Sequence, residues 1–210
     1  TLLGSWFLWT GLGSRLFQKA GSTVFPWLFM GLLFLTPFEI VLVRIVRPLF
    51  GFGMTPGPIL TVLTTAVFLF PVGVAVGGLF STGCAWQRER LRKIDPSQLY
   101  FLESAGAIAG GLFYTFLFSG RLSHLSIAAL FGAIASPALA ALSAGLRNKK
   151  HFLAVLTAVF AFTLICGAPF IERLSRRIQW KGYAWLATQD TRFSNLTITR
   201  TGDLKQLFHD

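Results

Sequence analysis

The chain has 210 residues and a formal net charge of +11; apolar residues make up 53% of it and charged residues only 13%. A typical globular chain carries about 25% charged residues, so this composition excludes an ordinary soluble domain. Intrinsic disorder is excluded as well, because disorder requires low hydrophobicity. The two cysteines, Cys84 and Cys166, are too few for a disulfide scaffold, and without a Cys/His cluster we predict no metal site. The composition predicts a polytopic membrane protein.

Six apolar runs follow one another along the chain, where a spanning helix needs about 20 apolar residues. They cover residues 1–13, 25–43, 58–80, 99–118, 122–146 and 152–171. We therefore predict an all-α polytopic membrane bundle of about six transmembrane helices over residues 1–171. The first run is too short to span a bilayer, and we interpret it as the second half of a truncated helix.

Two of these runs carry pairs of small residues at helical spacing. Gly73 and Gly77 are four residues apart, as are Gly106 and Gly110, and small residues at this spacing let helix backbones approach closely in lipid. Pro71 and Pro137 also fall inside runs, where neighbouring helices can satisfy the freed carbonyl groups. Simple helix packing is the favoured interpretation of all these residues.

Residues 172–210 differ in character from the apolar runs. A basic juxtamembrane stretch extends from Glu172 to Lys181, and the segment 196–200 then alternates apolar and polar residues as a half-buried strand does. Turn residues at 201–203 precede a second short run at 204–208. This pattern predicts a short C-terminal β-hairpin, which is only marginally stable alone and so either packs on the bundle or begins a soluble domain.

The basic residues lie at the edges of the apolar runs, where membrane proteins carry their topology signals. No nucleic-acid-binding motif accompanies them, so we expect a lipid bilayer and no nucleic acid as a partner. With six alternating spans, nine cations fall on one side: Arg15, Lys19, Arg88, Arg90, Arg92, Lys93, Arg147, Lys149 and Lys150. The other side has Arg44, Arg47 and Arg121, and the basic stretch after Ile171 raises its total to seven. The positive-inside rule therefore places the hairpin on the side away from the cytoplasm, by the small margin of nine cations against seven. If one of the six segments were re-entrant, the hairpin would face the cytoplasm.

Few ionisable residues lie inside the runs. Glu39 and Glu103 are carboxylates at membrane depth, and such residues are functional candidates because insertion of the charge is costly. They are our candidate substrate-binding residues, for a polyamine or another small cation. The structural alternatives are an ion pair of Glu39 with Arg44 or Arg47, and a favourable interaction of Glu103 with the N-terminus of its own helix. His124 is interpreted as an interfacial residue.

No sequence motif of a catalytic site is present. The chain has no Gly-x-Ser-x-Gly elbow, no His-Glu-x-x-His pair and no Walker lysine loop. We therefore assign no catalytic residue and no cofactor to this chain.

Three stretches together resemble one family, the membrane-anchored spermidine synthase-like proteins. They are Leu12-Gly13-Ser14-Arg15-Leu16-Phe17, then residues 99–111 (LYFLESAGAIAGG), then residues 185–203 (WLATQDTRFSNLTITRTGD). Members of that family join a multi-helix membrane region, distantly similar to major facilitator transporters, to a polyamine aminopropyltransferase-like domain. The last two stretches are the more specific ones.

The resemblance implies that residues 172–210 open an incomplete synthase-like domain with a Rossmann-like fold of the S-adenosylmethionine type. That domain would bind S-adenosylmethionine or its decarboxylated form, and the full-length protein would be an aminopropyltransferase-like or other transferase. The chain departs from the soluble members at Phe193-Ser194, where those proteins usually carry an aromatic residue followed by Gln. We expect an integral protein of a bacterial inner (plasma) membrane.

Two alternatives remain open. One is a fragment of a secondary transporter or permease of the major facilitator type, which requires internal repeats with a site at the midplane. The other is a non-catalytic membrane subunit whose hairpin docks a partner protein. The natural sequence after Asp210 distinguishes the three hypotheses. A synthase-like fusion requires a Gly-rich strand–turn–helix there, and a transporter requires further membrane spans. A non-catalytic subunit requires the chain to stop.

Overall fold

The computed structural model describes residues 2–50, 57–92, 95–142, 150–191, 195–201 and 204–209. Among these residues there are six α-helices followed by three β-strands. The helices are α1 (Leu2–Leu16), α2 (Phe25–Val46), α3 (Pro58–Leu91), α4 (Pro96–Phe113), α5 (His124–Leu142) and α6 (Lys150–Gln179). The strands are β1 (Ala184–Asp190), β2 (Asn195–Thr201) and β3 (Leu204–His209). The predicted bundle of six helices is confirmed for the described residues.

The helices begin where the sequence supplies the appropriate residues. Proline stands in the first turn of α2, α3 and α4, where its missing N–H costs nothing and its fixed φ suits a helix. Asp95 caps α4 by accepting a hydrogen bond from the Gln98 backbone N–H at 3.1 Å. After α4, the chain continues through a π-helical turn, Tyr114–Phe118, into the connection to α5.

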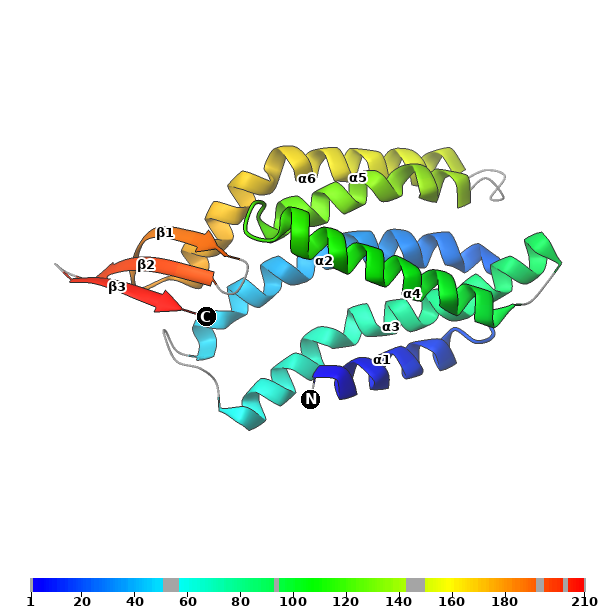
Figure 1. Ribbon diagram of the computed structural model, residues 1–210, viewed down its shortest axis with the longest axis horizontal. Coiled ribbons are helices and arrows are strands. Elements are labelled where there is room, and N and C mark those ends of the chain that lie inside the picture. The colour runs from blue at the N-terminus through cyan, green and yellow to red at the C-terminus, as the bar shows by residue number, and fades with distance from the viewer. Residues whose placement is uncertain are drawn as a thin grey trace.

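The helices run alternately up and down, so their connections lie at two opposite ends of the bundle (Figure 1). Helix α2 is central and contacts α3, α5 and α6. The pairs α1/α3 and α5/α6 pack most extensively, whereas α4 contacts α3 only sparsely and has no buried residue. The sheet stands at the end where α2 and α6 finish (Figure 1).

The close approach of α1 to α3 depends on the predicted glycines. A Cβ atom at Gly77 would overlap the carbonyl oxygen of Thr10, and one at Gly73 would overlap the side chain of Trp9. The indole of Trp9 also donates a hydrogen bond to the Ala66 carbonyl at 2.8 Å. The packing role of Gly73 and Gly77 is therefore confirmed. Gly106 and Gly110 of α4, by contrast, face open space, so the second pair makes no helix contact within the described chain.

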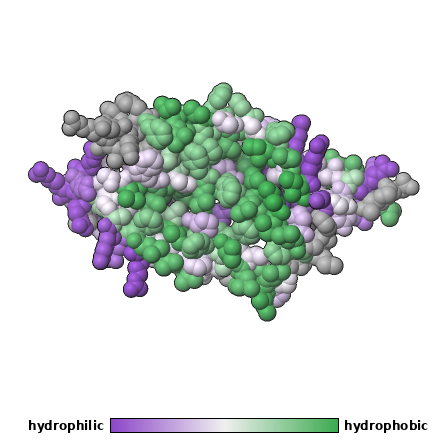
Figure 2. Space-filling view, turned by 180° about the vertical axis from the view of Figure 1, so that it is seen from behind, coloured by the Kyte–Doolittle hydropathy of each residue, from purple (hydrophilic) through white to green (hydrophobic). Residues whose placement is uncertain are grey.

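Four helical segments are long and apolar enough to cross a membrane: Ser22–Phe50, Pro58–Arg90, Pro96–Phe118 and Val155–Gln179. The apolar part of α5, His124–Leu139, is shorter. Apolar side chains cover the middle of the molecule and hydrophilic ones gather at its two ends (Figure 2). Large exposed apolar residues such as Phe7, Phe101 and Phe162, each more than 60% exposed, suit contact with lipid and would be a liability in water. These features describe an integral membrane protein.

The helices α3 and α6 extend beyond the apolar runs that predicted them. Helix α3 continues from the end of its run at Phe80 to Leu91, and α6 continues from Ile171 to Gln179. The basic juxtamembrane stretch, expected to follow the last span, is therefore mostly the final two turns of α6. These extensions hold charged residues, among them Arg88 and Arg90 in α3 and Arg176 and Arg177 in α6.

The predicted C-terminal hairpin is corrected to a three-stranded antiparallel sheet of order β1-β2-β3. β2 and β3 pair in the register expected for the hairpin, from Leu196 opposite His209 to Thr201 opposite Leu204. The turn residues 202–203 lie outside the described residues. The strand that the prediction missed is β1. Its register with β2 shifts between Trp185 and Ala187, so Leu186 forms a β-bulge that interrupts the alternation typical of a strand.

Candidate functional site

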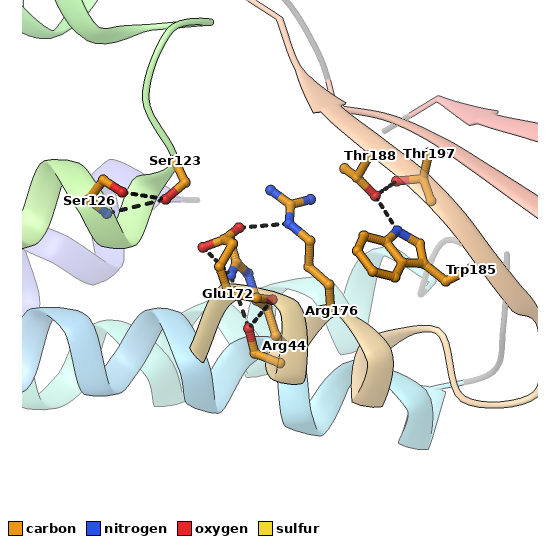
Figure 3. Close-up of polar contacts among 9 residues, drawn as sticks. Arg44, Ser123, Ser126, Glu172, Arg176, Trp185, Thr188 and Thr197 are labelled. Carbon is orange, nitrogen blue, oxygen red and sulfur yellow. Dashed lines mark hydrogen bonds and ion pairs between the residues drawn. The ribbon is translucent and has the colours of Figure 1, made fainter. Parts of the chain in front are cut away.

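A buried charged cluster joins α2 to α6 at the end of the bundle that carries the sheet (Figure 3). Arg44 Nη1 lies 2.9 Å from Glu172 Oε2, and Arg176 Nε lies 2.6 Å from Glu172 Oε1. Arg44 also donates a hydrogen bond to Ser175 Oγ at 3.1 Å. The three charged side chains are only 10%, 12% and 7% exposed, in the order Arg44, Glu172, Arg176. Buried charges need partners, and here one carboxylate bridges two helices.

The members of the cluster lie where α2 and α6 continue past their predicted apolar runs, which end at residues 43 and 171. Arg44 stands in the last turn of α2, where a cation interacts favourably with the helix C-terminus. Glu172 and Arg176 are four residues apart on α6, the spacing at which side chains meet on one helix face. Arg44, one of the two ion-pair partners suggested for Glu39, forms an ion pair with Glu172.

A second contact cluster fixes the sheet to the end of α6. The chain turns after α6 through Gly182, whose φ of 108° is accessible mainly to glycine. The ring of Trp180, 3% exposed, packs with those of Phe208 on β3 and Tyr183, at centroid separations of 5.0 and 6.4 Å. Arg47, just beyond α2, places its guanidinium 5.5 Å from the Trp180 ring centroid, within the range of a cation–π interaction.

The β-bulge in β1 brings Trp185 and Thr188 to the same face of the sheet. Without the extra residue, two strand positions three apart point to opposite faces. The Trp185 indole donates a hydrogen bond to Thr188 Oγ1 at 2.7 Å, and this hydroxyl lies 3.0 Å from Thr197 Oγ1 on β2 (Figure 3). Thr197 and Thr199 are 1% and 0% exposed, so this is the covered face of the sheet.

A polar cavity of about 320 Å³ lies where the α4–α5 connection, the end of α6 and β1 meet. Its lining includes three arginines and a single carboxylate, together with hydroxyl, amide and indole groups. The lining residues are Gly120, Arg121, Leu122, Ser123, Glu172, Arg173, Arg176, Trp185, Thr188 and Gln189. Ser123 also caps the N-terminus of α5, because its hydroxyl accepts a hydrogen bond from the Ser126 backbone N–H at 3.2 Å.

The two candidate carboxylates from the sequence lie on different helices. Glu39 is half-buried on α2 and Glu103 is exposed on α4. At a rise of 1.5 Å per residue, Glu39 lies about 21 Å from the start of α2, and Glu103 lies about 10 Å from the start of α4. Neither lines the polar cavity or either of two apolar cavities described next. Their role in binding a polyamine or small cation stays a prediction.

Two apolar cavities lie between helices of the bundle. One of about 520 Å³ lies between α2, α5 and α6 and is lined by residues such as Phe34 and Phe160. The other, of about 340 Å³, borders α2, α5 and the π-helical turn. His124 lines the second, with its Nε2 3.5 Å from Tyr114 Oη. This places His124 at the start of α5, at the same end of the bundle as the sheet.

Sequence reasoning missed Glu172 and Trp185 as site residues. A signal for Glu172 was present, because it is the lone acid of a basic stretch and has Arg176 four residues later. Trp185 gave no such signal, because its direction depends on the bulge. Phe193 and Ser194, where the chain departs from soluble aminopropyltransferases, lie outside the described residues.

The arrangement suits binding and attachment. The buried cluster and the aromatic contacts hold α2, α6 and the sheet together, and the cavity beside them offers positive charge and hydrogen-bond donors. Among the described residues, no group of three or more His, Cys, Asp or Glu side chains could hold a metal ion. Comparison of the chain with family models, with curated proteins and with solved structures finds no match.

Proposed function

We propose that this chain is a membrane anchor that holds a β-sheet module in a fixed orientation at the bilayer surface. Following the sequence resemblance, we further propose that it is the membrane region of a spermidine synthase-like protein. The sheet is then the opening part of an S-adenosylmethionine-type domain. The chain itself supplies attachment and orientation, while transferase chemistry belongs to the rest of that domain.

The observation that supports the anchoring role is the short, packed connection between α6 and β1. Trp180 is buried at the helix end and contacts Phe208 on the third strand. Arg47, from the end of α2, contacts the same indole. A sheet tethered only through the chain would pivot, whereas the packing of Trp180 against Phe208 on β3, with Arg47 against the same indole, restricts its orientation.

Distance measurement between spin labels tests the fixed orientation. Labels at Leu49, 80% exposed after α2, and Leu207, 66% exposed on β3, leave the packed residues intact. In nanodiscs we expect a narrow distance distribution, and a broad one when Trp180→Ala is added. Leu186→Ala, at an exposed position of β1, is the matched control and should leave the distribution narrow. A broad distribution in the unsubstituted protein would contradict an orienting role.

The synthase-like part of the proposal needs a separate test. Calorimetric titration of the natural protein in nanodiscs with S-adenosylmethionine and with its decarboxylated form should show saturable binding of at least one of them. The chain of residues 1–210 alone, titrated in parallel, should bind neither. Absence of binding to the natural protein would leave the anchoring role standing and remove the synthase-like assignment.

A further inference from the structure

The polar cavity at the sheet end of the bundle has the composition of an anion site. Arg121 comes from the α4–α5 connection, whereas Arg173 and Arg176 come from α6, so segments distant in sequence bring three cations to one cavity. The lining carboxylate, Glu172, has one oxygen against Arg44 and the other against Arg176. Arg121 and Arg173 therefore add positive charge that Glu172 does not neutralise.

Arg176 is held in place as part of the wall. Its side chain is 7% exposed, and the Nε contact with Glu172 fixes the direction of the guanidinium. Figure 3 shows the terminal nitrogens of Arg176 between Ser123 on one side and Thr188 on the other. Arginine presents a planar fork of donors that matches phosphate oxygens, and a fixed arginine loses less conformational freedom on binding than a mobile one.

The remaining lining groups suit a phosphate attached to a small organic group. Ser123 and Thr188 contribute hydroxyls and Gln189 an amide, which can bind oxygen atoms of the ligand. Trp185 supplies a flat apolar wall, and its indole N–H is already engaged with Thr188. A volume of about 320 Å³ lies at the small end of the range of roughly 300–1,000 Å³ for ligand pockets.

We propose that this cavity binds a phosphate-bearing anion, with Arg121, Arg173 and Arg176 as its cationic contacts. The position at the end of the membrane helices is compatible with two sources of that chemistry. One is the headgroup of an anionic phospholipid, since basic pockets at helix ends bind such headgroups. The other is a soluble phosphate monoester. The proposal does not depend on the synthase-like assignment.

Native mass spectrometry of the detergent-solubilised chain tests the site with three probes: dioleoyl phosphatidic acid, dioleoyl phosphatidylcholine and glycerol 3-phosphate. The test variant is Arg121→Gln/Arg173→Gln, because both arginines are exposed and their loss should spare the fold. The matched control is Arg88→Gln/Arg90→Gln, which removes two exposed arginines from the opposite end of the bundle. Both variants lose the same net charge.

We expect phosphatidic acid to bind at least tenfold more tightly than phosphatidylcholine. The Arg121/Arg173 variant should lose at least tenfold of that affinity and the control variant less than twofold. Competition by glycerol 3-phosphate identifies a site that accepts soluble phosphate esters, and its failure to compete identifies a lipid headgroup site. Equal losses in both variants, unchanged affinity in the Arg121/Arg173 variant, or no binding of either phosphate probe would overturn the proposal.

Discussion

Arg44 at the end of α2 and Glu172 near the end of α6 form a buried ion pair with 2.9 Å between Nη1 and Oε2. We expect Glu172→Gln to lower the free energy of unfolding by about 3–5 kcal/mol, because removing one member of a buried pair leaves a charge without its partner. Unfolding of the detergent-solubilised protein by denaturant titration measures this loss.

The control for that substitution is Glu89→Gln. Glu89 is exposed near the other end of the bundle, where it accepts a hydrogen bond from Ser22. Exposed polar pairs of this kind contribute about 1 kcal/mol or less. Equal stability of the two variants would show that the α2–α6 cluster does not hold the helices together.

The α1–α3 contact predicts that the same substitution, glycine to alanine, has different effects on stability at two positions. Gly77→Ala places a methyl group against the backbone of Thr10 and Ser14, which cannot move aside as a flexible side chain can. We expect a loss of about 1–3 kcal/mol, the usual range for overpacking. Gly106→Ala on α4 meets no neighbour within 4 Å and should be neutral or slightly stabilising. Thermal unfolding in the same detergent compares them, and a similar loss at both positions contradicts the packing of α1 against α3.

The hydroxyl of Thr188 connects the bulged strand to its neighbour. Thr188→Val removes the acceptor of the Trp185 indole and a partner of the buried Thr197 hydroxyl. Unsatisfied buried groups cost about 1–3 kcal/mol, so we expect faster hydrogen exchange in β1 and β2. Thr163→Val, on an exposed face of α6 where the hydroxyl binds its own helix, makes the same chemical change and should leave exchange in the sheet unaltered.

The intramembrane carboxylates carry a separate prediction. If Glu39 and Glu103 contact a small cation, Glu39→Gln/Glu103→Gln should abolish binding of spermidine by the protein in vesicles. Glu89→Gln is again the control, since it removes a carboxylate from an exposed helix end. Spermidine binding that survives the double substitution would remove both residues from any substrate site.

The sequence predicted the helices well where apolar composition alone decides the structure. The starts of α2 and α3 match the predicted runs at Phe25 and Pro58, because lipid requires long helices with their backbone groups satisfied internally. The ends of α3 and α6 were missed, since helical hydrogen bonding continues past Phe80 and Ile171, where hydropathy falls.

The candidate site was less accessible to sequence reasoning. The strand β1 lacks an alternating pattern because its bulge breaks the period of two, so Trp185 could not be assigned a direction. The polar cavity depends on the meeting of the α4–α5 connection, α6 and β1, and no local pattern encodes that meeting. Of the buried charged cluster, only the ion pair between Glu172 and Arg176 could be predicted from sequence, because the two residues are four positions apart on one helix.

An integral six-helix bundle that carries the sheet at one of its two ends makes a direct prediction about topology. The test is labelling of single cysteines with a membrane-impermeant reagent in sealed vesicles, in a Cys84→Ser/Cys166→Ser background. Lys19→Cys and Arg90→Cys report one end, Leu49→Cys and Arg121→Cys report the other, and Lys205→Cys reports the sheet. We predict that Lys205→Cys reacts from the same side as Leu49→Cys and Arg121→Cys, and from the side opposite to Lys19→Cys and Arg90→Cys. Reaction of Lys205→Cys from the side of Lys19→Cys, or reaction of all five positions from one side, would contradict this topology.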